Sequence, residues 1–137
     1  SQVDLMDLHD ILSAIRQLVN DCEDAIDEGK LAVSTGNIDD IFRYIEVTSE
    51  IFNRASFVLK EAKKVVETHG KDSLTKYINT YYRMLTLISL PYMITILKDM
   101  MQILYKQGRN DKAVEINKLI ENFENTLDTL KLKQGVL

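Results

Sequence analysis

The sequence predicts an all-α protein, folded as an up-down-up-down four-helix bundle of long antiparallel helices that forms a single domain over residues 1–137. Apolar residues recur with gaps of three and four over long stretches, which is the period of a helix with one buried face. A glycine follows each of the first three stretches, and the stretches are of similar length. The predicted helices cover residues 3–34, 38–69, 73–106 and 110–134. Because the links between them are short, sequential helices must run antiparallel.

The first helix is predicted from seven apolar residues whose gaps alternate between three and four. These residues are Leu5, Leu8, Leu12, Ile15, Val19, Cys22 and Ile26. The C-terminal end of this helix has two alternatives: the helix stops at Gly29, or it continues to about Ser34 with the glycine inside it. The longer helix costs about 1 kcal/mol relative to alanine at Gly29. It is preferred because it matches its neighbours in length.

The second and fourth helices follow the same rule. Their apolar stripes are Ile38, Ile41, Ile45, Thr48, Phe52, Ala55, Leu59, Ala62 and Val66, and then Ala113, Ile116, Ile120, Phe123, Leu127 and Leu130. The breaks fall at Gly36, Gly70 and Gly108, where a residue free to adopt positive φ can end a helix. Capping residue types follow within three positions at Asn37, at Asp72 or Ser73, and at Asn110.

The third helix departs from this regularity at Pro91. Its stripe comprises Leu74, Ile78, Tyr81, Leu85 and Ile88, and it resumes out of phase as Met93, Leu97, Met100 and Leu104. Proline removes a backbone hydrogen bond and clashes with the carbonyl four residues earlier, which belongs to Leu87. We therefore expect a kink at residues 87–91, with the hydroxyl of Thr86 or Ser89 bonding to the freed backbone.

Around Pro91 the third helix is apolar on nearly every side, more than the stripe of about 100° that one buried face needs. One interpretation is that the kink turns different faces into the same core. The other is a second buried interface in a homodimer or larger assembly. The candidate self-association surface comprises Leu87, Leu90, Ile94 and Met101.

The composition indicates the class of protein and the cellular compartment to expect. The hydrophobic fraction of 45% is that of a globular chain, and the single Cys22 cannot form an internal disulfide. No signal-peptide pattern opens the sequence, so we expect a soluble intracellular protein or part of an intracellularly assembled particle. The longest uncharged run, Met84–Leu97, is 14 residues long and contains proline. A membrane-spanning helix needs about 20 apolar residues, so no membrane span is expected.

No catalytic, cofactor-binding or metal-ligating residue is predicted. Helical di-iron sites use Glu-x-x-His, but Met6 precedes His9 by three residues and Val66 precedes His69. Cys22 lies on the apolar stripe, where a structural thiol is expected rather than a nucleophile. Phosphate-binding glycine loops and paired-cysteine metal motifs do not occur. The sequence therefore predicts a protein that is not an enzyme and has no cofactor.

Charge is distributed unevenly along the chain. Residues 1–50 contain 12 acidic and 3 basic residues, whereas residues 51–137 contain 9 acidic and 14 basic residues. A candidate acidic partner-binding end lies around the first turn and comprises Asp24, Asp27, Glu28, Asp39 and Asp40. These charges either keep the protein soluble or contact a partner with a basic surface, including the basic end of another copy.

The sequence disfavours nucleic acid as a partner. Binding needs clustered Lys and Arg. The only cluster comprises Lys60, Lys63, Lys64, Lys71 and Lys76, and acidic residues interrupt it. Tyr77, Tyr81 and Tyr82 lie beside it and could stack on bases, but the apolar stripe predicts that Tyr81 faces the core.

Two turns, at residues 32–41 and 104–116, resemble the helix–glycine–helix turns of tetratricopeptide-type repeats. The predicted helices are about twice that family's length, so we attribute the likeness to shared turn chemistry. The leading hypothesis is a non-enzymatic, self-assembling structural subunit that forms a homo-oligomer; a cellular scaffold and a virion protein fit equally well. The alternative is an adaptor that receives a partner helix or basic peptide, and a third hypothesis is a weak nucleic-acid binder.

Overall fold

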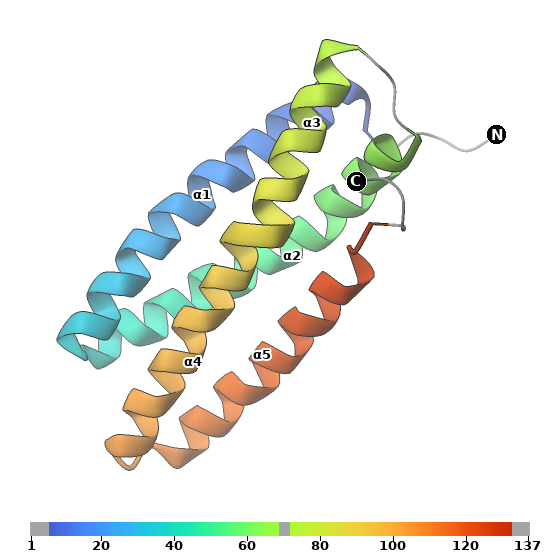
Figure 1. Cartoon of the computed structure of the whole chain (residues 1–137). Helices are drawn as coiled ribbons and strands as arrows, with labels where there is room; N and C mark the ends of the chain where they lie inside the picture. Colours follow the sequence, from blue (N-terminus) through green and yellow to red (C-terminus); the bar gives the residue numbers. More distant parts are fainter. Residues whose placement is uncertain (1–5, 69–71, 133–137) are drawn as a thin grey trace.

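The structure, a computed structural model that describes residues 6–68 and 72–132, is 91% helical and forms a four-helix bundle (Figure 1). Within the described residues there is no β-strand. The helices are α1 (Leu8–Thr35), α2 (Ile38–Thr68), a long third helix made of α3 (Ser73–Met84), η1 (Leu85–Ser89) and α4 (Leu90–Lys106), and α5 (Asn110–Thr129). The predicted fold class is confirmed.

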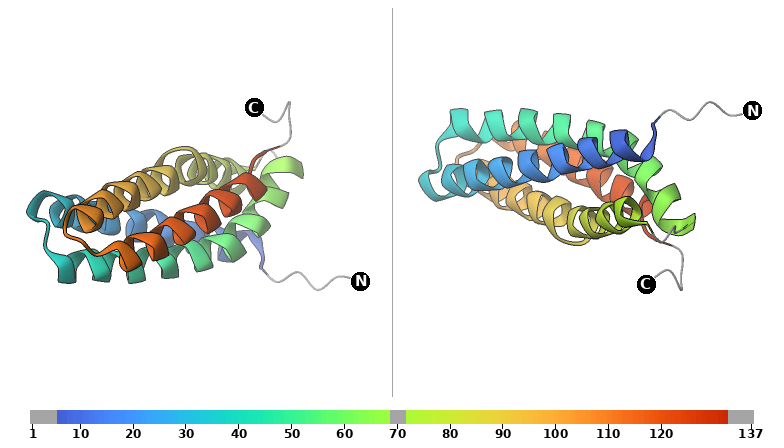
Figure 2. Two further views of the ribbon diagram at one scale, coloured as in Figure 1. Left: turned by 90° about the horizontal axis from the view of Figure 1, so that it is seen from below. Right: turned by 90° about the horizontal axis from the view of Figure 1, so that it is seen from above.

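Sequential helices run antiparallel, as the two views of Figure 2 show. α1 packs against α2 and along the whole third helix, whereas α5 packs chiefly against α4 and touches α2 through fewer contacts. The start of α1, the end of α2, the start of α3 and the end of α5 therefore meet at one end of the bundle (Figure 1). The turns between α1 and α2 and between α4 and α5 lie at the other end.

Two of the predicted glycine breaks are confirmed. Gly36 has φ 68° and Gly108 has φ 74°, which are left-handed conformations that glycine adopts without a steric penalty. The Gly36 N–H donates to the carbonyl of Ala32 at 2.8 Å and closes the end of α1. Gly70 lies outside the described residues.

Side chains cap three helix starts. Asp7 accepts from the Asp10 N–H at 2.9 Å, so α1 begins at Leu8 and the predicted start at residue 3 is wrong. Asn37 accepts from the Asp40 N–H at 3.0 Å, as predicted. Asp72, also predicted, accepts from the Thr75 N–H at 2.8 Å, and this hydrogen bond lowers the pKa of its carboxyl. Hydrogen bonds between residues close in sequence therefore fix where these three helices begin.

The cap predicted at Asn110 is wrong, because Asn110 is already the first helical residue of α5 and Arg109 occupies the cap position. The end of α5 also differs from the prediction, since the helix stops at Thr129 instead of residue 134. Other helices bond to the carbonyls at this end: the Lys63 ammonium donates to Thr129 at 3.1 Å, and the Tyr82 hydroxyl donates to Leu130. Contacts between distant helices thus fix where α5 ends.

Where a kink was predicted at residues 87–91, the structure has a π-helical turn over Leu85–Ser89. In η1 the Leu90 N–H donates to the carbonyl of Leu85, five residues earlier, so the turn holds one extra residue. Pro91 follows η1 directly and lies in the first turn of α4, where its lack of a backbone N–H removes no required hydrogen bond. The Thr86 hydroxyl donates to the Tyr82 carbonyl at 2.9 Å, which also accepts from the Leu85 N–H, and so this bond does not serve the Leu87 carbonyl that Pro91 was predicted to free. The extra residue is the physical reason for the change of phase.

Gly29 lies inside α1, which confirms the longer of the two predicted helices, and it is buried. A Cβ atom at this position would lie 2.5 Å from Cε1 of Tyr44 and 3.0 Å from Cγ2 of Ile96. The Tyr44 hydroxyl donates to the carbonyl of Met93 at 3.0 Å. Glycine therefore lets α1 approach a tyrosine that links α2 to α4.

One helix within the described ranges, Ser73–Lys106, is long and apolar enough to cross a membrane by length and composition. Its most apolar 18-residue window has a mean hydropathy of 1.3, and 44% of that window is buried in the bundle. Leu85, Leu90 and Leu97 on this helix are fully buried. Core packing accounts for part of its apolar composition, and the absence of a membrane span stays a prediction.

Candidate interaction surfaces

The structure divides the four residues of the predicted self-association surface. Leu90 and Ile94 are buried in the core, at 0% and 4% exposure, so their assignment to an exposed surface is wrong. The extra residue in η1 turns both of them inward, as the alternative interpretation of the third helix anticipated. Met101 is half-buried against the core, and only Leu87 is well exposed.

A smaller apolar surface remains at η1, and we call it the bulge patch: Leu87, Ile88 and Tyr92. Leu87 is 67% exposed and Ile88 is 65% exposed, although the stripe predicted Ile88 in the core. Tyr92 is partly exposed, and the Lys30 ammonium lies 5.3 Å from the centre of its ring. This cation–π contact joins α1 to α4 beside the patch.

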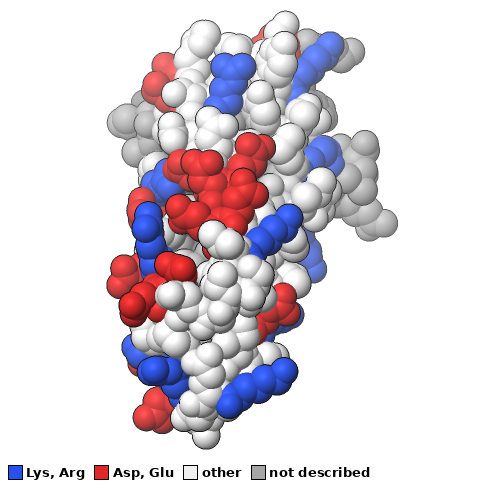
Figure 3. Space-filling model, turned by 90° about the vertical axis from the view of Figure 1, so that its left-hand side faces the viewer, with Lys and Arg blue, Asp and Glu red and all other residues white. Residues whose placement is uncertain are grey.

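The acidic residues at the first turn all lie on the surface, as predicted: Asp24, Asp27, Glu28, Asp39 and Asp40. Figure 3 shows acidic side chains gathered near the middle of the face to which α1 contributes. Asp39 and Asp40 occupy the first turn of α2, where the helix dipole stabilises negative charge. A pocket of about 120 Å³ opens between Glu28 and Asp40, but Arg43 also lines it and lies 3.8 Å from Glu28. A basic partner would have to compete with this internal cation.

A groove between α1 and α2 was not predicted. It has a volume of about 520 Å³, and its lining is mostly apolar. Its residues are Ala14, Gln17, Leu18, Asn53, Arg54, Phe57 and Val58, and we call them the α1–α2 groove. Phe57 is 52% exposed. The sequence feature that could have indicated this groove is Phe57, an aromatic residue that lies off the apolar stripe of α2.

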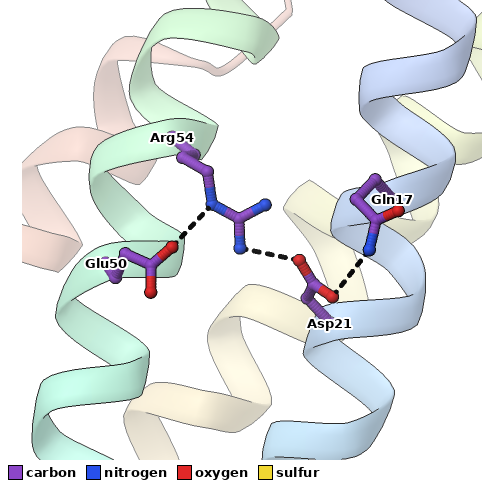
Figure 4. A network of polar contacts seen from close by, with 4 residues as sticks. All are labelled: Gln17, Asp21, Glu50 and Arg54. Carbon is purple, nitrogen blue, oxygen red and sulfur yellow. Dashed lines mark hydrogen bonds and ion pairs between the residues drawn. The ribbon is translucent and has the colours of Figure 1, made fainter.

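A polar network closes one side of the α1–α2 groove (Figure 4). Arg54 on α2 donates to Asp21 on α1 at 2.7 Å, and its Nε lies 3.3 Å from the carboxylate of Glu50. Gln17 donates to the other oxygen of Asp21 at 3.0 Å. Asp21 and Arg54 are both half-buried, so this pair holds α1 and α2 together more effectively than a fully exposed pair would.

The reactive side chains of the core are held neutral. Burial raises the pKa of Cys22 to about 12, so its thiol is protonated and inaccessible at neutral pH. Burial also raises the pKa of Tyr44 and that of Tyr82 above the ordinary value. Across residues 6–68 and 72–132, no three His, Cys, Asp or Glu side chains gather in a way that could hold a metal ion.

The three tyrosines considered for base stacking all lie on α3 and differ in exposure. Tyr82 is fully buried, and the Arg16 guanidinium lies 5.9 Å from the centre of the half-buried Tyr81 ring. Tyr77 is 53% exposed. Tyr77 and Tyr81 are four positions apart and lie on the same side of α3, so burial removes only Tyr82 from a stacking surface.

No protein-family model, no curated protein and no solved structure matches this chain. Any function proposed for this chain therefore depends on the surfaces described above.

Proposed function

We propose that this protein is a non-enzymatic structural subunit that acts through protein–protein contacts and associates with copies of itself. The observation that supports this most directly is the exposure of large apolar side chains on two faces of a bundle whose core is already filled. Leu87 and Ile88 form one of these faces, and Phe57 beside its groove forms the other. Covering a side chain of this size contributes about 1.5–3 kcal/mol, which favours association.

Two faces would allow assembly beyond a dimer, because contacts on separate surfaces can link one pair to the next. A cellular scaffold and a virion protein are both consistent with such a subunit. Sedimentation equilibrium over about a hundredfold range of protein concentration tests the proposal. We expect a mass above that of the monomer that rises with concentration, and a strict monomer throughout would refute it.

A second candidate function is the capture of a basic peptide at the acidic end. The pocket between Glu28 and Asp40 favours it, because carboxylates on two helices there could bind one Lys or Arg side chain. Titration with a lysine-rich peptide at low salt tests this function by fluorescence anisotropy. Asp40→Asn should weaken binding several-fold, whereas Glu121→Gln on the exposed face of α5 should leave it unchanged. Equal affinities of both variants would argue against the acidic end.

A further inference from the structure

The exposed face of α2 carries a stripe that complements itself in charge. Glu50, Phe57 and Lys64 are separated by seven residues, so they lie almost in line along the helix. The side chains of Glu50 and Lys64 are 70% and 74% exposed, and Phe57 is 52% exposed. An acid, an aromatic ring and a base thus follow one another at equal spacing on one accessible face.

This stripe borders the α1–α2 groove. Leu18 and Val58 form an apolar floor, Ala14 lies beside them, and Phe57 stands at the edge. An aromatic side chain that entered the groove would cover Phe57 and remove both apolar surfaces from water. The groove therefore accepts the same kind of group that its own edge presents.

We propose that two copies of the chain associate through the α1–α2 groove, with their α2 helices antiparallel across a two-fold axis beside Phe57. In this arrangement each Phe57 packs at the groove of the other copy. Glu50 and Lys64 both lie about 10 Å along the helix from Phe57, in opposite directions. The axis therefore places Glu50 of each copy opposite Lys64 of the other, which gives two equivalent ion pairs.

Charge on the rest of α2 favours this orientation. Acids predominate in the first half of α2, where Asp39, Asp40, Glu46 and Glu50 are exposed beside Arg43, and the exposed charged residues of the second half are Lys60 and Lys64. Antiparallel helices place the acidic half against the basic half, whereas parallel helices would place like charges together. The bulge patch carries no comparable pattern that would identify what covers it.

The ion pairs within one chain do not prevent this association. Glu50 lies 3.3 Å from Arg54 and Lys64 lies 2.8 Å from Glu61, whose own side chain is only 16% exposed. The Glu50 and Lys64 side chains themselves are 70% and 74% exposed, and ion pairs made by such exposed groups are weak and exchange readily. Arg54 keeps its 2.7 Å hydrogen bond to Asp21 when Glu50 turns away. The link between α1 and α2 thus survives association.

Charge reversal at the two ends of the stripe tests the inference. In Glu50→Lys, two lysines face each other at both contacts, and in Lys64→Glu, two glutamates do. We expect each variant alone to raise the dimer dissociation constant at least about tenfold, because two contacts become repulsive. An equimolar mixture restores complementary charges at both contacts, so it should form a heterodimer with nearly the parent affinity. With one of the two variants uniformly labelled with ¹⁵N, native mass spectrometry resolves the heterodimer by mass, and circular dichroism confirms that each variant is folded.

Glu121→Lys on α5 is the matched control, since it makes the same change of charge on another exposed helix face and should leave association unchanged. Phe57→Glu should also abolish association, because it places charge at the axis. This inference rests on the proposed function, but the two can fail separately. A parent chain that is monomeric at every concentration overturns both. Association that persists in Glu50→Lys, Lys64→Glu and Phe57→Glu, and without preference for the heterodimer, overturns the groove interface alone.

Discussion

Replacing Gly29 with alanine tests how closely α1 approaches its neighbours. On an isolated helix the change would stabilise by about 1 kcal/mol, because glycine is the poorer helix former. In the bundle the new Cβ would lie 2.5 Å from Cε1 of Tyr44, 2.8 Å from its Cδ1, and 3.0 Å from Cγ2 of Ile96. All of these separations require a neighbouring atom to move.

Tyr44 has little freedom to move, because it is 1% exposed and its hydroxyl is bonded to the carbonyl of Met93. Inserting a carbon atom into a packed core typically costs about 1–3 kcal/mol, and here the ring or the whole of α1 must shift. We therefore expect Gly29→Ala to lower the free energy of unfolding by about 2 kcal/mol, despite its better helix propensity. The melting temperature should fall by roughly 5–10 °C.

Urea denaturation monitored by circular dichroism measures this difference, provided that the slope of the transition is unchanged. The matched background is Tyr44→Leu, which removes the ring atoms that the new Cβ would meet. In that background Gly29→Ala should be neutral or stabilising, by up to about 1 kcal/mol. A stabilised Gly29→Ala in the parent chain, or an equal cost in both backgrounds, would refute the close approach.

Two further predictions concern the buried thiol and a helix cap. Because the folded state keeps Cys22 protonated up to a pKa of about 12, its contribution to stability is complete below pH 9 and is lost as the pH rises from there. The raised pKa values of Tyr44 and Tyr82 act in the same direction above about pH 10. Denaturation between pH 8 and 10 should show falling stability, with a shallower fall in Cys22→Ala; equal slopes would contradict this. Asn37→Ala should cost about 1 kcal/mol by removing the cap of α2, whereas Ser34→Ala should cost less, and the difference in melting temperature measures it.

Local chemistry determined much of the fold. The spacing of apolar residues predicted four helices, and glycine with a capping side chain predicted where α1 ends and α2 begins. Asn37 and Asp72 form their caps with backbone N–H groups three residues away, so neighbours in sequence suffice for both. The acidic residues around the first turn were also predictable as surface residues, because they lie off the apolar stripes.

Tertiary contacts decided the rest, and each such contact joins residues that are far apart in the chain. α5 ends where Tyr82 bonds to the carbonyl of Leu130, 48 positions away, and no local signal marks that residue. The π turn moved Leu90 into the core and left Ile88 outside, which a constant helical period cannot anticipate. Phe57 gained its importance only from the groove that α1 forms beside it. The period of a sequence reports which side of one helix is apolar, but the register of that helix against its neighbours depends on how their side chains fill the space between them.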